Sequence, residues 1–527
     1  MRDSISVWLL VAAILIVVGA FVAECAWGTV PSDSSIFRYI GRQVVEGKVL
    51  YRDVWDNKGP VLFLPAIIGY ALLPWGTHGP GAVSCLMWCA SVLLMYQIGR
   101  RLLNSKLVAG GATVAFVLLA VAMGNVYFQY NQEAVSVFFA LFGLWALLRR
   151  GQNSVPTRAT MLKIGGLLAF GASAGCVFLI KPNLLSFALA VGVVWVCDVV
   201  LRQSSISRLL GRIFWASVGF VGVVAGVSAV FVWKGALYDF WDATLLFGLF
   251  EYCKTETSWF AWWGEYLRSV AGWKSMILQW LIATGVLFVL ALKGVGLFWK
   301  DGNRRLAIFV GAWMVCETIM AVAFKTFYVH YLIVALVPIC WGVARLLLET
   351  FPLSLARTAV SAKPPQGRDF ELGSVGRISR LRRQLFKGWV TILLGGVFLI
   401  SAYYIAMGLR YTYCQNRIKA EIVAWAKNNI GVGATVVSSG GLMIPELLDV
   451  LRLKTPQRYF NVAMNHRFAG SFRRKAIEDE MTAVMTEGTM TWLLLPTGAE
   501  ELGFTVLKDG WRLVVPSAYC NFWRKVR

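Results

Sequence analysis

Two acids and two lysines stand where apolar segments of the chain give way to polar ones. Asp33 and Lys58 follow the first apolar segment, and Glu133 and Lys181 each stand beside a later one. A carboxylate at the boundary between water and lipid can accept a proton from a hydroxyl group. A lysine in the same place can stabilise the charge of a phosphate. Whether such chemistry is possible depends on the elements that position these side chains.

The composition predicts a protein built from membrane-spanning helices. Hydrophobic residues make up 58% of the chain and charged residues 15%. Apolar stretches of about 17–25 residues, long enough to cross the hydrocarbon core as helices, recur along it. The formal net charge of +23 comes from basic residues in short loops, as in cytoplasmic loops, and therefore does not indicate nucleic-acid binding. We predict a multi-pass, all-α protein of the cell membrane, embedded in the lipid bilayer.

The charges of the loops predict the side that each loop faces. Loops that begin near Arg100, Arg149, Arg202 and Lys293 are basic and poor in acids, as is the segment 350–388, whereas the segments between them hold most of the acids. Positive charge favours the cytoplasmic side, so we predict about eleven spans with a cytoplasmic N-terminus. The predicted spans are 6–24, 81–98, 108–124, 133–148, 164–180, 184–201, 213–233, 276–292, 306–323, 330–348 and 389–408.

A further apolar stretch, 61–74, does not fit this alternation. If it crossed the membrane, every later loop would change sides and the basic loops would face outward. The stretch is also short and contains Pro65 and Pro74. We therefore predict that it lies at the membrane interface or re-enters from the outer face.

Three polar regions are predicted on the outer side. The first is a loop at 27–80, and the second is a loop at 234–275, whose many Trp and Tyr residues favour helices lying on the membrane. The third region begins at residue 410 and has the periodicity of a small α/β domain. In that region, helices are predicted at 415–428 and 472–486, and apolar strands at 434–437, 492–495 and 511–515. The predicted domains are a transmembrane domain at 1–349, a basic cytoplasmic loop at 350–388, a last span at 389–409 and an extracytoplasmic α/β domain at 410–527.

The first outer loop contains a predicted amphipathic helix. Apolar residues recur at helical spacing from Ile36 to Val44, and Arg38 and Arg42 fall on the opposite side. This pattern is typical of a helix lying in the membrane interface. Asp33 stands where the helix begins, a place in which capping the helix is an alternative to chemistry.

This loop resembles the corresponding part of the GT-C glycosyltransferases, specifically the bacterial branch related to protein O-mannosyltransferases and the lipid A aminoarabinose transferase. In that branch a first span leads to an Asp, then to a surface helix ending in a Gly-x-x-x-Tyr stretch, then to a Lys/Pro turn. The matching residues here are Asp33, Gly47 to Tyr51, and Lys58-Gly59-Pro60. The layout is similar over residues 1 to about 350, and the motifs only in this loop. Ser34 stands where the family often has Glu, and Gly59 where it often has Pro.

The resemblance implies a transmembrane catalytic domain and an inverting transfer of a sugar on the outer face. The donor would be a polyprenyl-phosphate-linked sugar, and the acceptor a hydroxyl of a glycolipid, a cell-wall polysaccharide or a protein. Asp33 would act as the base, and Lys58 and Tyr51 would contact the substrate. The leaving phosphate needs charge stabilisation from lysine, arginine or a divalent cation; the absence of an acidic pair at 33–34 weakens the case for a metal there. For Lys58 the alternative is a lysine that snorkels to the interface.

The resemblance points to three further places. Glu133 occupies the position of a second acid, although a Glu that begins a helix is also favoured by the helix dipole. Lys181 lies in an outer turn similar to a recurrent family turn, where phosphate binding and attraction to headgroups are both open. His330 and Tyr331 match a pair near the lipid-phosphate site, and an interfacial aromatic anchor is the alternative.

Two other classes of protein compete with a glycosyltransferase. A transporter or flippase of lipid-linked sugars would carry ionisable residues within its spans, whereas the predicted spans are nearly free of charge, with Glu317 the chief exception. A polysaccharide ligase or polymerase uses similar lipid-linked donors but lacks the first-loop Asp and helix.

Overall fold

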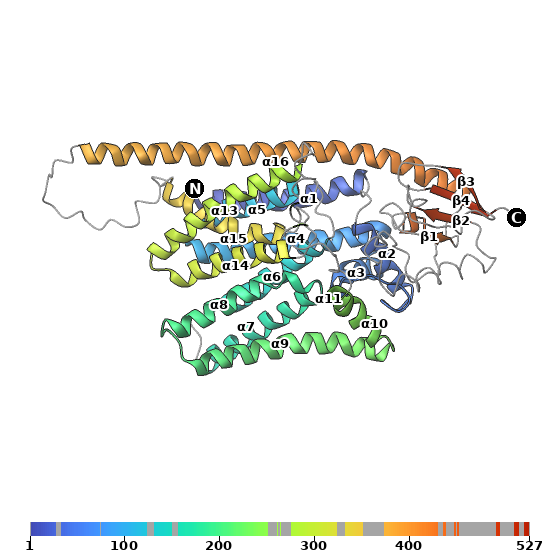
Figure 1. The fold of residues 1–527 in the computed structure, drawn as a ribbon, viewed down its shortest axis with the longest axis horizontal. Helices are drawn as coiled ribbons and strands as arrows, with labels where there is room; N and C mark the ends of the chain where they lie inside the picture. The colour runs from blue at the N-terminus through green and yellow to red at the C-terminus, as the bar shows by residue number, and fades with distance from the viewer. Residues whose placement is uncertain are drawn as a thin grey trace.

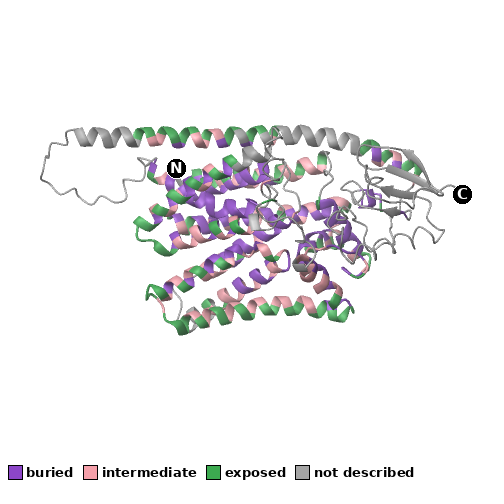
Figure 2. Cartoon of the chain, viewed as in Figure 1, coloured by how far each residue is buried: buried purple, intermediate pink, exposed green. Residues whose placement is uncertain are grey.

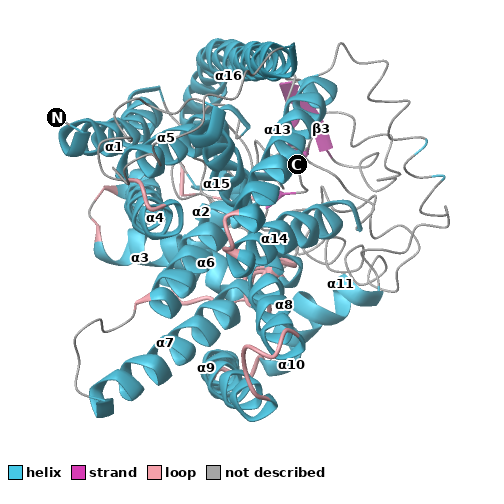
Figure 3. Cartoon of the chain, turned by 90° about the vertical axis from the view of Figure 1, so that its left-hand side faces the viewer, coloured by secondary structure: helices cyan, strands magenta, loops and turns pink. Residues whose placement is uncertain are grey.

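The computed structural model shows a bundle of long helices that run side by side, with a small sheet beyond one end of the bundle (Figure 1). The structure describes residues 2–27, 33–73, 75–123, 131–149, 156–250, 261, 264, 276–323, 332–350, 374–430, 436–438, 447–449, 451–452, 492–495, 511–515 and 521–525. Figure 3 looks along the bundle and shows α15 in its interior, with α16 and α9 on opposite sides.

Each predicted span falls on one of the long helices. Within the described residues, seven helical stretches are long and apolar enough to cross a membrane by length and composition, and α6, α7 and α8 lie among the shorter apolar helices. This composition confirms a multi-pass membrane protein, while the number and direction of the crossings stay predictions. The helices are α1 (Arg2–Trp27), α4 (Gly79–Leu103), α5 (Lys106–Met123), α6 (Gln132–Leu148), α7 (Pro156–Phe178), α8 (Ser186–Val200), α9 (Ile206–Trp233), α13 (Met276–Lys300), α14 (Arg304–Ala323), α15 (Ile333–Thr350) and α16 (Ser374–Asn429).

The core of the bundle forms around α15, which is buried over most of its length (Figure 2). Its Trp341 ring lies 6.0 Å from the Trp313 ring of α14, and both side chains are fully buried. On its other side α15 approaches α13 so closely that a Cβ atom at Gly294 would lie 1.8 Å from the Gly342 carbonyl oxygen. Because apolar surface gives little driving force between helices in lipid, such close backbone contact is a main source of their association.

We expect Gly294→Ala to force α13 and α15 apart and to destabilise the protein by about 1–3 kcal/mol, the usual cost of overpacking. The measurement is the thermal unfolding midpoint of the purified protein in detergent. Gly296→Ala is the matched control, since it lies on the same helix and a Cβ atom there would meet nothing within 4 Å. Equal midpoints for the two variants would contradict the role of this helix crossing.

The first outer loop folds into two short helices packed against each other. They are α2 (Asp33–Val45) and α3 (Leu64–Leu72), the latter preceded by a 3-10 turn, η1 (Pro60–Phe63). The helices cross at Gly41, where a Cβ atom would lie 2.3 Å from the Ala66 Cβ atom. A second 3-10 turn, η2 (Gly76–His78), leads into α4.

The helix predicted after Asp33 is confirmed, and its arginines lie against protein. Arg38 and Arg42 are 2% and 6% exposed. An ion pair of 3.6 Å joins Arg38 to Glu24 of α1, and Arg42 also has buried partners. The polar side of the helix is therefore covered by protein. The partners of the two arginines supply the pairing that buried charges require.

The second outer loop begins with short helical turns that return to the first loop. They are α10 (Leu237–Trp241), the π-helix η4 (Asp242–Leu246) and α11 (Phe247–Phe250). Phe240 of α10 stacks on Phe231 of α9 with the ring centroids 4.5 Å apart. This aromatic pair provides the surface against which part of the first loop packs.

The C-terminal region combines a very long helix with a small sheet. Helix α16 runs unbroken through the predicted last span and the predicted helix 415–428. Strands β2 (Trp492–Leu495) and β3 (Trp511–Val515) coincide with predicted strands, whereas β1 (Val437–Ser438) shares only residue 437 with the predicted strand 434–437 and β4 (Asn521–Lys525) was not predicted. The sheet order is β1-β2-β4-β3, with β1 and β2 parallel and the other pairs antiparallel. The predicted helix 472–486 lies outside the described residues.

Candidate functional site

The turn that follows α2 is built around Tyr51. Its backbone has a positive φ of 70°, and its N–H donates to the Val54 carbonyl at 2.7 Å. The Tyr51 ring packs against Phe231 and Phe240 with centroid distances of 5.4 and 5.7 Å. Its hydroxyl donates to the Lys58 carbonyl at 2.7 Å. Burial and the nearby Asp56 charge hold the pKa of Tyr51 well above its ordinary value, so the hydroxyl stays protonated and can keep this bond.

Lys58 is held on the inner side of the same turn. Its ammonium group lies 3.2 Å from a carboxylate oxygen of Asp56, which is buried, and 5.7 Å from the centre of the Phe37 ring. The same Asp56 oxygen accepts from the Lys58 N–H at 3.0 Å. Phe37 lies one helical turn after Asp33 on α2. The Lys58 ammonium therefore lies against the N-terminal half of α2.

Backbone hydrogen bonds join this turn to the turn between α7 and α8. The Gly59 N–H donates to the Ile180 carbonyl at 3.1 Å, and the Val61 N–H to the Leu179 carbonyl at 3.2 Å. A Cβ atom at Gly59 would lie 1.9 Å from the Leu179 oxygen. The difference from the common family Pro thus has a physical reason, since proline would add atoms here and remove the Gly59 donor. Lys58 and Lys181 are distant in the sequence, and this contact places them on two turns whose backbones lie next to each other.

Glu133 lies in the first turn of α6, but it does not cap that helix. The cap is Asn131, whose side chain accepts from the Ala134 N–H at 2.8 Å. Glu133 is 0% exposed, and within the described part of the chain neither of its carboxylate oxygens has a hydrogen-bond partner. A buried carboxylate in this state is costly unless a proton, a cation or a hydrogen-bond donor reaches it.

Glu317 of α14 joins this site, although the sequence analysis treated it only as an exception among the spans. It is 1% exposed and accepts a hydrogen bond from the Ser186 hydroxyl at the beginning of α8. The charges of Glu133 and Lys181 lie near enough to act on it. An ionisable residue inside a span is a functional candidate in its own right, and that rule could have identified Glu317 from the sequence.

Of the remaining predicted residues, Asp33 is described and lies at the surface, whereas the other two are not described. Asp33 is the first residue of α2 and is exposed. His330 and Tyr331 lie outside the described residues. Within those residues, no group of three or more His, Cys, Asp or Glu side chains comes together as a metal site would require. The described site therefore consists of an exposed acid, two lysines on adjoining turns and two buried acids.

Comparison with known proteins places this arrangement in a known fold. No family model matches the chain. Over 98% of its length the chain superimposes on ArnT from Cupriavidus metallidurans bound to undecaprenyl phosphate, with a TM-score of 0.60, 15% sequence identity and 97% of that chain covered. The chain has a GT-C fold. The archaeal oligosaccharyltransferase AglB from Archaeoglobus fulgidus, in complex with an inhibitory peptide and a dolichol-phosphate, matches with a TM-score of 0.51, 12% identity and coverage of 94% of this chain and 70% of that one.

A sequence relative of the GT-C chain supports the same assignment over a shorter stretch. A dolichol phosphate-mannose mannosyltransferase from Haloferax volcanii is 29% identical over 151 residues, which are 27% of this chain. The match spans about a third of that relative's length, 32%. The family resemblance seen in the first outer loop is thus confirmed at the level of the fold.

We expect Ser186→Ala to destabilise the protein by about 1–3 kcal/mol, since it removes a hydrogen-bond donor from a buried carboxyl group. The measurement is again the thermal unfolding midpoint in detergent. Thr318→Ala is the control on α14, because the Thr318 hydroxyl donates only to the backbone carbonyl of Met314 on its own helix at 2.8 Å. If both variants lose equal stability, Ser186 does not support Glu317.

Proposed function

We propose that this GT-C protein is an inverting glycosyltransferase that takes a sugar from a polyprenyl-phosphate donor. The observation that carries the proposal is the pair of backbone hydrogen bonds that sets the Lys58 turn against the Lys181 turn, with Lys181 and Glu133 both close enough to act on the buried Glu317. Two cations beside two acids suit a reaction in which a hydroxyl loses a proton while a phosphate leaves. The ArnT structure that shares this fold was solved with undecaprenyl phosphate bound, and lipid phosphate is the ligand that the two lysines would bind here.

The proposed reaction is a single displacement at the anomeric carbon. The acceptor hydroxyl oxygen forms the new bond to this carbon, and the bond to the phosphate oxygen breaks on the opposite face, which inverts the configuration. The hydroxyl proton goes to the Asp33 carboxylate. The polyprenyl phosphate leaves with the bonding electron pair, and Lys58 and Lys181 stabilise its charge. A divalent cation could share this last role.

The exposure of the two acids supports different roles for them. Asp33 is exposed at the rim, where an acceptor arriving from water can reach it. Glu133 is fully buried, and its charge acts on Glu317 as that of Lys181 does, so its proposed role is contact with the sugar of a bound donor. A glycolipid, a cell-wall polysaccharide or a protein would serve as the acceptor. The site would face outward at the cell membrane, with the C-terminal region on the same side and the N-terminus in the cytoplasm.

The buried acids of α8 and α14 argue against a transport pathway. Glu317 meets Ser186 at one end of α8, whereas Asp198 near the other end is held by Arg212 and Arg305 at 3.0 and 2.6 Å. The part of α8 between these two points is apolar. The polar groups of this helix therefore form two separate clusters, and a pathway for a polar substrate would require them to continue through the span.

We expect Asp33→Asn to leave the protein inserted and stable while transfer falls at least ~100-fold, the lower range for loss of a general base. The measurement compares membrane glycolipids and glycopolymers of cells that lack the gene and carry either the wild-type or the variant copy. Asp301→Asn is the control, because Asp301 is an exposed acid paired with Arg345 at 2.6 Å. Near-normal product from Asp33→Asn would remove Asp33 from the role of base.

We expect Lys58→Gln to weaken the binding of undecaprenyl phosphate about 10- to 100-fold, as loss of a charged hydrogen bond would. Binding is measured on the purified protein in detergent by titration with undecaprenyl phosphate. Lys234→Gln is the matched control, since the Lys234 ammonium lies 4.4 Å from the centre of the Trp233 ring and represents an ordinary interfacial lysine. Equal effects of the two substitutions would leave Lys58 with the interfacial role alone.

A further inference from the structure

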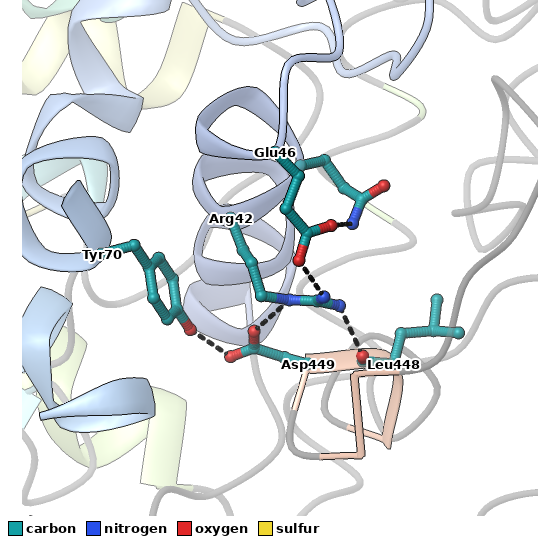
Figure 4. A network of polar contacts seen from close by, with 6 residues as sticks. Arg42, Glu46, Tyr70, Leu448 and Asp449 are labelled. Carbon is teal, nitrogen blue, oxygen red and sulfur yellow. Dashed lines mark hydrogen bonds and ion pairs between the residues drawn. The ribbon is translucent and has the colours of Figure 1, made fainter. Parts of the chain in front are cut away.

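A buried polar network ties the C-terminal region to the first outer loop. The Arg42 Nε atom of α2 donates to an Asp449 carboxylate oxygen at 3.0 Å, and the Arg42 Nη2 atom donates to the Leu448 carbonyl at 2.6 Å. The other Asp449 oxygen accepts from the Tyr70 hydroxyl of α3 at 2.5 Å. Figure 4 shows the Asp449 carboxylate between Arg42 and Tyr70, so that one side chain joins both helices of the first loop.

The burial of this network makes the ion pair between Arg42 and Asp449 costly to break. The Arg42 and Asp449 side chains are 7% and 1% exposed, although the residues lie 407 positions apart in the sequence. A buried charge that loses its partner is strongly unfavourable, whereas exposed ion pairs contribute little. The network therefore disfavours any arrangement in which the segment 447–449 leaves the first loop.

The same contact is supported by apolar packing. Ile422 and Ala426 of α16, together with Leu447, Leu448 and Leu451, belong to one buried cluster with residues of α2, η1 and α10. Helix α2 is thus held at three points, by Glu24 through Arg38, by α3 at Gly41 and by Asp449 through Arg42. Asp33 stands at the beginning of this helix, so the position of its carboxylate depends on how the helix is fixed.

We propose that Asp449 is a positioning residue for the transfer reaction, and that the C-terminal region acts through it as a built-in part of the outer site. This inference rests on the proposed function for its effect on turnover. Asp449 binds α2 and α3 in one orientation relative to the turn that carries Lys58. It touches neither donor nor acceptor, and its effect reaches the reaction through the placement of Asp33.

The test uses the full-length protein in detergent or lipid nanodiscs and four variants. Asp449→Asn replaces one acceptor oxygen with a donor group and removes the charge opposite Arg42. Tyr70→Phe removes one hydrogen bond and leaves the ion pair in place. Glu46→Gln is the matched control. Glu46 also binds Arg42, at 2.8 Å, but it belongs to the first loop, as Arg42 does, so it does not join this loop to the C-terminal region, and its side chain is 42% exposed.

Three quantities are measured on each variant: amide hydrogen exchange over residues 33–45, binding of undecaprenyl phosphate, and the kcat of sugar transfer. For Asp449→Asn we expect exchange in α2 to rise at least tenfold and kcat to fall at least tenfold, with binding of undecaprenyl phosphate changed less than threefold. Tyr70→Phe should show the same pattern to a smaller extent, and Glu46→Gln should behave as wild type. Asp449→Glu keeps the negative charge opposite Arg42, and its kcat should lie between that of Asp449→Asn and that of the wild type.

Two results would overturn the proposal. One is unchanged exchange in α2 of Asp449→Asn, which would show that the contact does not hold the helix. The other is an equal loss of phosphate binding and of kcat, which would show a general loss of folded protein rather than a positional effect. If wild-type protein bound undecaprenyl phosphate but transferred no sugar, the proposed function would fail, and the exchange measurement would still decide whether Asp449 holds α2.

Discussion

The two backbone hydrogen bonds that join Gly59 and Val61 to the turn at 179–180 are the contact on which the outer site depends. They form between two segments that belong to different helix pairs and set the backbone of the Lys58 turn against that of the Lys181 turn. Only a residue without a side chain fits at position 59, where a Cβ atom would overlap the Leu179 oxygen. Without this contact the two cations would belong to separate loops, each near headgroups but with no common ligand.

Further groups surround Lys58 in the turn that this contact holds. The Tyr51 hydroxyl donates a hydrogen bond to the Lys58 carbonyl, and Asp56 forms an ion pair with the Lys58 ammonium group. The buried acids Glu133 and Glu317 approach from helices of the bundle. In a low-dielectric interior such charges interact strongly, so their arrangement favours an anionic ligand beside the lysines and a donor of hydrogen bonds beside the acids.

Hydropathy and loop charge were sufficient to predict the helices, because the need to satisfy backbone groups in lipid leaves few alternatives to a long apolar helix. The amphipathic pattern of the first loop likewise predicted α2. The partners of Arg38 and Arg42 could not be predicted, since an amphipathic pattern shows which side of a helix is polar but not whether water or protein covers it. Glu317 and Ser186 illustrate the same limit, because their meeting depends on the packing of α8 against α14. Asp449 lies in a stretch with no motif, so only the fold reveals that it reaches the first loop.

The length of α16 has a mechanical consequence. At about 1.5 Å per residue, its 56 residues make a rod of about 84 Å, roughly twice the full thickness of a bilayer with its headgroups. Even a strongly tilted rod of this length must project beyond the lipid. The C-terminal part of this helix, at Ile422 and Ala426, packs into the cluster that surrounds α2. An unbroken helix transmits tilt and rotation along its axis, so a force applied near its basic beginning would reach the cluster around α2.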